Sequence, residues 1–153
     1  MNRQHQAPWE CIYRKEEKSD CKPGKRPKSD QKYFEILCLC LLQAGLNWGS
    51  IRKHWKKYKE GFYRFDIYRL SRMRANVLLK GPHVIKNNRK VEAVIHNAKE
   101  FQKIRREFGS FFHFLKTLNP LRREELFKLL LKRFIHIGAY TVKYYLHSVG
   151  YWK

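Results

Sequence analysis

Acidic residues are scarce in this chain. Among its 153 residues, 13 are Asp or Glu and 34 are Lys or Arg, which gives a formal net charge of +21 at pH 7. A charge of that size destabilises a compact protein by self-repulsion, and a partner of opposite charge relieves the repulsion. The composition therefore indicates a polyanion, with DNA or RNA as the first candidate and an anionic membrane surface as the rival. Codon bias in an AT-rich genome is the alternative that needs no partner.

Long apolar segments are also missing. No apolar run occurs within residues 1–30, so the sequence shows no signal peptide. The longest apolar run, residues 36–42, is far too short to cross a bilayer. The four cysteines lack the spacing of a disulfide framework, which is typical of a reduced protein. We therefore expect an intracellular protein without a membrane span, located in the cytoplasm or nucleoid, or in the nucleus of a eukaryote.

The chain nevertheless has enough apolar residues for one packed domain. Hydrophobic residues make up 43% and aromatic residues 15% of the sequence, which argues against disorder of the whole chain. Residues 1–30 are predicted to be a basic, loosely structured arm, because the prolines and glycine within residues 22–28 cannot continue a helix. Residues 31–153 are expected to form one helical domain. No segment alternates with period two, so we predict an all-α fold.

Helix boundaries can be placed from caps and from apolar periodicity. Asp30 and Asp66 are good N-caps, and Gly45 and Gly109 end helical segments. The expected helices cover residues 31–44, 49–60, 67–72, 74–80, 87–106, 110–118, 120–133 and 138–149.

A helix–break–helix pattern surrounds Gly81 and Pro82 and resembles a helix-hairpin-helix. Such a hairpin can bring backbone N–H groups at a helix N-terminus to a DNA phosphate. The alternative is an ordinary corner between two helices with solvated lysines. The flanking cations that would assist phosphate binding are Lys80, Lys86, Arg89 and Lys90.

Several short motifs occur in a fixed order. They are Phe-Glu-Ile-Leu-Cys-Leu at 34–39, Gln-Ala-Gly-Leu-Asn-Trp at 43–48, Phe-Asp at 65–66, the segment 84–98, Phe-Gly-Ser-Phe at 108–111 and the segment 138–150. Over about residues 33–150 the chain resembles DNA-3-methyladenine glycosylase I. The resemblance implies a helix-hairpin-helix DNA glycosylase-like bundle that flips a methylated adenine from duplex DNA and hydrolyses its N-glycosidic bond. It also implies a monomer that needs no cofactor and binds duplex DNA containing damaged bases.

The resemblance further implies the residues of a base pocket. Trp48 matches the tryptophan on which the family stacks the flipped base, Trp9 matches the Cys-Pro-Trp signature, and Tyr13 matches the Tyr-His-Asp motif. Gln43 and Leu46 lie beside Trp48 in sequence and are candidates to contact DNA in the gap left by the flipped base. Without the resemblance, Trp48 and Trp9 would be interpreted as core aromatics and Leu46 as a packing residue.

Cys40 is the main departure from the family. It stands eight residues before Trp48, at the catalytic position where the family carries the glutamate that recognises the flipped base. A thiol is a weak hydrogen-bonding group and is normally neutral, so it cannot replace a carboxylate that favours a cationic base. Glu35 is no substitute, because the family has an acidic residue at that place as well. His83 is a second departure, since the family has glycine there.

The zinc ligands of the family are missing as well. The family's N-terminal cysteine falls at Ala7 and its histidine falls near Arg14, and its C-terminal histidine and cysteine fall beyond the last residue. We therefore expect no metal ion and an arm that is tied less tightly to the domain. A new metal site built from His5, Cys11 and Cys21 is the alternative.

Three functions remain open at this point. The first is a base-excision repair glycosylase that removes an alkylated, 3-methyladenine-type base. Cys40 and the missing zinc ligands support the second, a DNA-binding protein of the same fold that has lost catalysis. The third is a glycosylase with altered base preference, because a neutral pocket suits a less charged lesion. Nothing in the sequence resembles an aromatic sheet that reads RNA, which disfavours an RNA partner.

Overall fold

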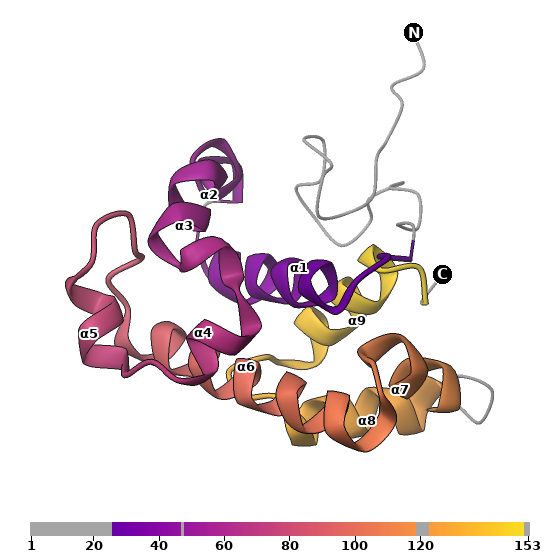
Figure 1. Ribbon diagram of the computed structural model, residues 1–153. Coiled ribbons are helices and arrows are strands. Elements are labelled where there is room, and N and C mark those ends of the chain that lie inside the picture. The colour runs from indigo at the N-terminus through magenta and orange to yellow at the C-terminus, as the bar shows by residue number, and fades with distance from the viewer. Residues whose placement is uncertain (1–25, 47, 119–122, 152–153) are drawn as a thin grey trace, which may run out of the picture.

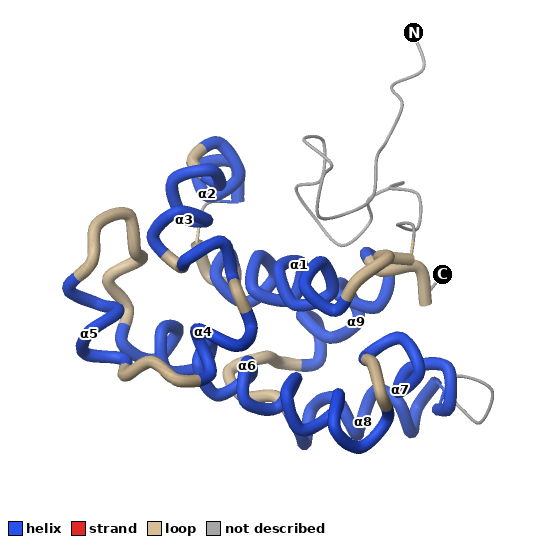
Figure 2. The backbone as a smooth tube through the Cα atoms, in the orientation of Figure 1, coloured by secondary structure: helices blue, strands red, loops and turns tan. Residues whose placement is uncertain are grey.

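The computed structural model describes residues 26–46, 48–118 and 123–151 (Figure 1), with backbone alone at three positions next to the gaps. Within these ranges every regular element is a helix (Figure 2), which confirms the all-α fold. Most of the predicted arm, including Trp9 and Tyr13, lies outside the described residues. The elements are α1 (Asp30–Gln43), α2 (Trp48–Lys53), α3 (Trp55–Gly61), a short 3-10 turn η1 (Tyr63–Phe65), α4 (Ile67–Ser71), α5 (Ala75–Lys80), α6 (Asn88–Phe108), α7 (Phe111–Leu118), α8 (Arg123–Arg133) and α9 (Ala139–Ser148).

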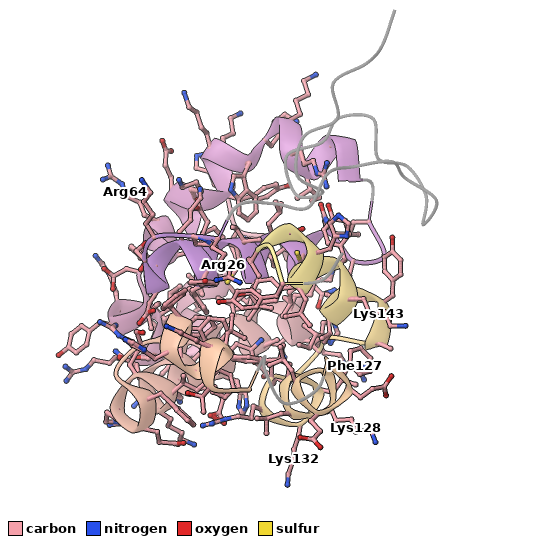
Figure 3. All side chains as sticks on the ribbon, turned by 90° about the vertical axis from the view of Figure 1, so that its right-hand side faces the viewer. Arg26, Arg64, Phe127, Lys128, Lys132 and Lys143 are labelled. Carbon is pink, nitrogen blue, oxygen red and sulfur yellow. The ribbon has the colours of Figure 1, made fainter. Side chains whose placement is uncertain are left out.

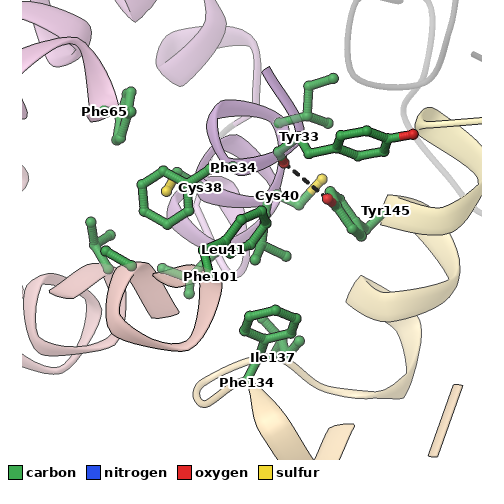
Figure 4. Close-up of a cluster of buried hydrophobic side chains, with 14 of the residues drawn as sticks. Tyr33, Phe34, Cys38, Cys40, Leu41, Phe65, Phe101, Phe134, Ile137 and Tyr145 are labelled. Carbon is green, nitrogen blue, oxygen red and sulfur yellow. Dashed lines mark hydrogen bonds between the residues drawn. The ribbon is translucent and has the colours of Figure 1, made fainter. Parts of the chain in front are cut away.

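Helix α1 is the centre of the fold and contacts α2, α6, α7 and α9. Its residues 33–43 are all buried, as expected for a helix that is apolar nearly all round. Phe34 meets Phe101 of α6 edge to face, with ring centroids 5.2 Å apart. On the other side, the Tyr145 hydroxyl of α9 donates a hydrogen bond of 2.9 Å to the Tyr33 carbonyl oxygen (Figure 4). The core therefore fixes α1 from two sides.

The N-cap of α1 differs from the prediction, which was Asp30. Ser29 is the N-cap, and its hydroxyl accepts a 3.1 Å hydrogen bond from the Lys32 N–H. The carboxylate of Asp30 instead accepts a 2.9 Å hydrogen bond from the Phe111 N–H and lies 3.2 Å from Arg105 Nε. Asp30 therefore satisfies a backbone donor at the beginning of α7 and joins α1, α6 and α7.

The single helix expected over residues 49–60 is in fact two helices. The chain leaves helical geometry at His54, where φ is −103° and ψ is 17°. The break allows Trp55 to stack on Phe65, with ring centroids 5.1 Å apart and planes 13° apart. Phe65 in turn stacks on Phe62 at 5.2 Å. Tertiary stacking of these three rings accompanies the break, which no local signal in the sequence marks.

Helices α4 and α5 both pack on α6. Asp66 caps α4 as predicted, because its carboxylate accepts a 2.8 Å hydrogen bond from the Arg69 N–H. The cap of α6 is Asn87, whose side-chain oxygen accepts a 3.1 Å hydrogen bond from the Lys90 N–H. The hairpin that joins α5 to α6, residues 81–87, leads directly into this cap.

Candidate nucleic-acid interface and base pocket

The hairpin between α5 and α6 packs closely on the end of α3. A Cβ atom added to Gly61 would lie 2.4 Å from the His83 carbonyl oxygen, so the backbone of the hairpin needs glycine at that place. His83 itself has a φ of +61°, in the left-handed region that favours glycine. The position at which the family has glycine is therefore one where this chain holds histidine in a strained conformation.

Lys80, Lys86 and Arg89 surround this hairpin and are all exposed. The Lys86 ammonium donates hydrogen bonds to the Leu79 carbonyl oxygen and, at 2.8 Å, to the Gly81 carbonyl oxygen, so it caps the last turn of α5. Within the described ranges no carboxylate pairs with Lys80 or Arg89. Two unpaired cations therefore lie beside the N-terminus of a long helix, an arrangement that binds phosphate.

The prediction that Lys90 is a further cation for DNA has to be corrected. The Lys90 side chain is 4% exposed, and its ammonium donates hydrogen bonds to the carbonyl oxygens of Leu42 at 2.8 Å and Ala44 at 2.5 Å. Burial lowers the pKa of Lys90. The side chain points into the protein and caps the end of α1, so it presents no exposed charge. Lys90 instead joins the first turn of α6 to the turn between α1 and α2.

The turn between α1 and α2 carries three of the predicted site residues. Gly45 has a φ of +74°, and the Leu46 N–H donates a 3.0 Å hydrogen bond to the Gln43 carbonyl oxygen. Leu46 is 43% exposed at the tip of this turn. Trp48 follows as the first residue of α2, and its side chain is not among those described. The turn thus places an exposed apolar side chain and the backbone of the matching tryptophan close to the hairpin.

Three hydrogen-bonded side chains, those of Gln43, Arg52 and Tyr144, form a group that we call the polar wall. The Gln43 side chain is 1% exposed, and its Oε1 accepts a 3.4 Å hydrogen bond from Arg52 Nε. Arg52 also donates to the hydroxyl oxygen of Tyr144, which is 92 residues away in sequence. Among the described residues the Nε2 of Gln43 has no hydrogen-bond partner. A buried donor of this kind is uncommon and is suited to receive a ligand or a water molecule.

Sequence reasoning missed Arg52 and Tyr144 as members of this site. Arg52 lies in a strongly basic helix, where its neighbours give the same local signal of a solvated cation. Tyr144 lies in the last helix and approaches Arg52 because α9 packs on α1. Only the tertiary arrangement brings the two side chains together.

Cys40 lies one turn before Gln43 on the same helix and is 2% exposed. Figure 4 shows it beside Tyr145, within the cluster of buried apolar side chains. Burial raises the pKa of Tyr145, and nearby thiols and carboxylate add to the effect. Cys40 is therefore part of a neutral environment in which a charged group would have to find its own partner.

Glu35 is the buried carboxylate of the described chain, at 6% exposed. Its oxygens lie 2.8 Å from Lys32 Nζ and 2.7 Å from Lys59 Nζ. Burial alone would raise the pKa of Glu35, but the two ammonium groups prevail and lower it. The carboxylate forms ion pairs with these two lysines and lies two turns of α1 before the polar wall.

Metal ligands do not gather in the described part of the chain. There, no three His, Cys, Asp or Glu side chains are close enough to hold an ion together. His5, Cys11 and Cys21 lie outside it. The residues at two of the zinc positions implied by the resemblance, Ala7 and Arg14, have no zinc-binding donor. Across the same described ranges, no helix is long and apolar enough to cross a membrane.

Comparison with known proteins decides the family. A sequence model described as methyladenine glycosylase matches residues 13–128. The chain belongs to the methyladenine glycosylase family. It is 29% identical over 149 residues to the DNA-3-methyladenine glycosylase of Haemophilus influenzae, covering 83% of this chain and 80% of the relative. It is also 29% identical over 93 residues to DNA-3-methyladenine glycosylase 1 of Escherichia coli, covering 58% of this chain and 50% of the relative.

Solved structures of methyladenine glycosylases share the fold. The 3-methyladenine DNA glycosylase I of Staphylococcus aureus, solved to explain 3-methyladenine recognition, has a TM-score of 0.74 at 25% identity, covering 88% of this chain and 83% of that one. A variant of 3-methyladenine DNA glycosylase I in complex with 3-methyladenine has a TM-score of 0.74 at 26% identity, covering 88% and 84%. In this methyladenine glycosylase the hairpin, the α1–α2 turn and the wall of Gln43, Arg52 and Tyr144 form the candidate site.

Proposed function

We propose that this chain is a DNA repair glycosylase that hydrolyses the N-glycosidic bond of an alkylated, 3-methyladenine-type base in duplex DNA. The observation that carries the proposal is the link made by Lys90. Its ammonium joins the first turn of α6, beside the exposed cations of the hairpin, to the end of α1 that leads to Leu46 and Trp48. One buried side chain thus links the element that we propose to bind phosphate with the turn that we propose to bind the base.

The mechanism begins with extrusion of the base. An enzyme cannot reach the glycosidic carbon of a stacked nucleotide, so the nucleotide must leave the duplex, at a cost of a few kcal/mol that is least for a damaged base. Lys80, Arg89 and the N-terminus of α6 would bind the phosphates beside the lesion. Leu46, which is exposed at the tip of its turn, would occupy the gap in the stack.

The pocket would then hold the extruded base. Trp48 would stack on its ring. The buried Nε2 of Gln43, which lacks a partner in the described chain, offers a donor for an acceptor atom of the base. Arg52 orients that amide through Oε1. A 3-methylated adenine is cationic and is a good leaving group, so these contacts have to orient and desolvate the base more than activate it.

A second candidate function is a DNA-binding protein of this fold without catalysis. The observation that favours it is Cys40, a buried neutral thiol one turn before Gln43, at the position where the family resemblance implies a carboxylate. Whichever function holds, we propose that the protein acts on DNA as a monomer, at an intracellular site, with residues 1–30 as a basic arm.

The test is the release of bases from duplex DNA treated with a methylating agent. The purified chain should release methylated adenine above the spontaneous rate, as separated and quantified by chromatography. Trp48→Ala should abolish the release, whereas DNA affinity should change little. Absence of release by the natural chain, together with normal DNA binding, would establish the binding function instead.

A further inference from the structure

Away from the hairpin, the outer surfaces of α4 and α6 enclose a hollow of about 590 Å³. Helix α6 contributes Lys99, Lys103 and Arg106. Tyr68 comes from α4, and Arg72 is the residue that follows α4. The three cations of α6 are spaced i, i+4 and i+7, so they lie along one stripe of the helix and face the same way. All four cations are exposed.

Helix α6 also carries three carboxylates. Glu100 and Glu107 lie 3.7 Å and 3.1 Å from Arg133 of α8. Glu92 lies two turns before Lys99 and accepts a 3.2 Å hydrogen bond from the Asn88 side chain. Arg105 pairs with Asp30 at 3.2 Å. In the described ranges no carboxylate forms an ion pair with any cation of the hollow. Four positive charges therefore share a concave surface without compensation, which is costly unless an anion binds there.

An exposed aromatic ring completes the hollow. Tyr68 is 60% exposed, and the guanidinium of Arg72 lies 5.1 Å from its ring centroid and donates a hydrogen bond to its hydroxyl oxygen. The arginine holds the ring in one orientation on the surface. Cations that follow a backbone, combined with a ring that can pack on a sugar or a base, are the features of a nucleic-acid contact.

We propose that the α4–α6 hollow binds the phosphodiester backbone of DNA at a point separate from the lesion. Lys103 is fourteen residues after Arg89 on the same helix, which places it about 21 Å from the hairpin at 1.5 Å per residue. That distance exceeds the span of the phosphates that flank one flipped nucleotide. The hollow is thus a second DNA contact of the enzyme, and the proposal rests on DNA being its partner but not on base removal.

The test compares two triple variants with the same loss of charge. The first is Lys99→Gln, Lys103→Gln and Arg106→Gln. The matched control is Lys128→Gln, Lys132→Gln and Lys143→Gln, three exposed lysines of α8 and α9 on the side of the molecule seen in Figure 3. The affinity for an undamaged 30-base-pair duplex is measured over a range of salt concentrations, because each phosphate contact adds about −0.9 to the slope of log affinity against log salt.

We expect the hollow variant to flatten this slope by about 2–3 units and the control to change it by less than about one. Equal slopes for the two variants would overturn the proposal. Pyrophosphate is the second probe: if it binds the natural chain and not the hollow variant while the DNA slopes stay equal, the hollow is a site for small phosphates and the DNA assignment fails. If the slopes differ but no form releases a base, the hollow stands and the proposed function falls.

Discussion

The hairpin and the α1–α2 turn are the two regions that we propose to contact DNA, and they are held in place in different ways. The hairpin is an exposed element whose cations lie in solvent and whose backbone is strained at His83. The turn is fixed from inside, by the buried ammonium of Lys90 and by the core around α1. The difference predicts that DNA affinity and base choice can vary separately, because surface charge would govern affinity and the buried surroundings of Cys40 and Gln43 would govern base choice.

The largest effect is expected from removing the link between the two regions. Lys90→Met leaves the carbonyl oxygens of Leu42 and Ala44 without a donor, and hydrogen bonds to a charged group contribute roughly 1.5–3 kcal/mol each. Because burial of the ammonium costs part of this gain, we expect the free energy of unfolding in urea to fall by about 2–4 kcal/mol. Arg89→Met, at an exposed position one residue earlier, is the control and should cost less than about 0.5 kcal/mol. If Lys90→Met is as stable as the natural chain, the hydrogen bonds of Lys90 contribute nothing to stability.

Alkaline pH should weaken the core around α1. Burial raises the pKa of Tyr145 above that of an unfolded tyrosine, which is about 10. Stability from this group is complete below pH ~10 and is lost as pH rises further, by up to about 1.4 kcal/mol per pH unit. Tyr145→Phe should be less stable at pH 8, where it lacks the bond to Tyr33, but should lose less stability between pH 9 and 11. Tyr68→Phe, at an exposed phenol, should retain the pH dependence of the natural chain.

The hairpin cations should alter binding without altering the pocket. Lys80→Gln with Arg89→Gln removes the two cations that no described carboxylate pairs with. The salt slope of duplex binding should flatten by about two units, at 0.9 per phosphate. The rate of base release at saturating protein should stay unchanged. A slower rate at saturation would show that the hairpin also shapes the pocket, and would break the separation between the two regions.

The smallest effect concerns backbone strain. His83→Gly relieves a left-handed conformation and should stabilise the protein by about 0.5–1 kcal/mol. His136 has a similar φ of +60° far along the chain, so His136→Gly is a matched change outside the site. Both variants should be more stable on thermal unfolding. If His83→Gly is less stable than the natural chain, the imidazole makes a contact that outweighs the strain.

Much of the fold was predictable because its signals are local. The helix predicted over residues 87–106 and the cap predicted at Asp66 both depend on residues within a few positions of one another, and both predictions are confirmed. Two predictions were wrong: one continuous helix over residues 49–60, and Asp30 as an N-cap. The break at His54 and the contacts of Asp30 each depend on a partner from a distant part of the sequence.

In the candidate site, too, local features were predictable and features that depend on tertiary packing were not. Exposed cations such as Arg89 are recognisable from composition and spacing, although their contact with DNA stays a prediction. Lys90 gave the same sequence signal and turned out to be buried, because only the packing of α6 on α1 shows where its side chain points. The pocket roles of Trp48 and Cys40 came from family resemblance and stay predictions.

The central claim is that the neutral group at position 40 sets base choice, whereas binding is set elsewhere. Single-turnover release of 3-methyladenine from methylated duplex tests it most directly, in the natural chain, in Cys40→Glu and in the neutral control Cys40→Gln. A charge-assisted hydrogen bond contributes roughly 1.5–3 kcal/mol, so Cys40→Glu should raise a slow release by about ten- to a hundredfold. Cys40→Gln should not raise it, and DNA affinity should stay the same in all three. Efficient release by the natural chain that Cys40→Glu leaves unchanged or lowers, in a protein that remains folded, would contradict the account.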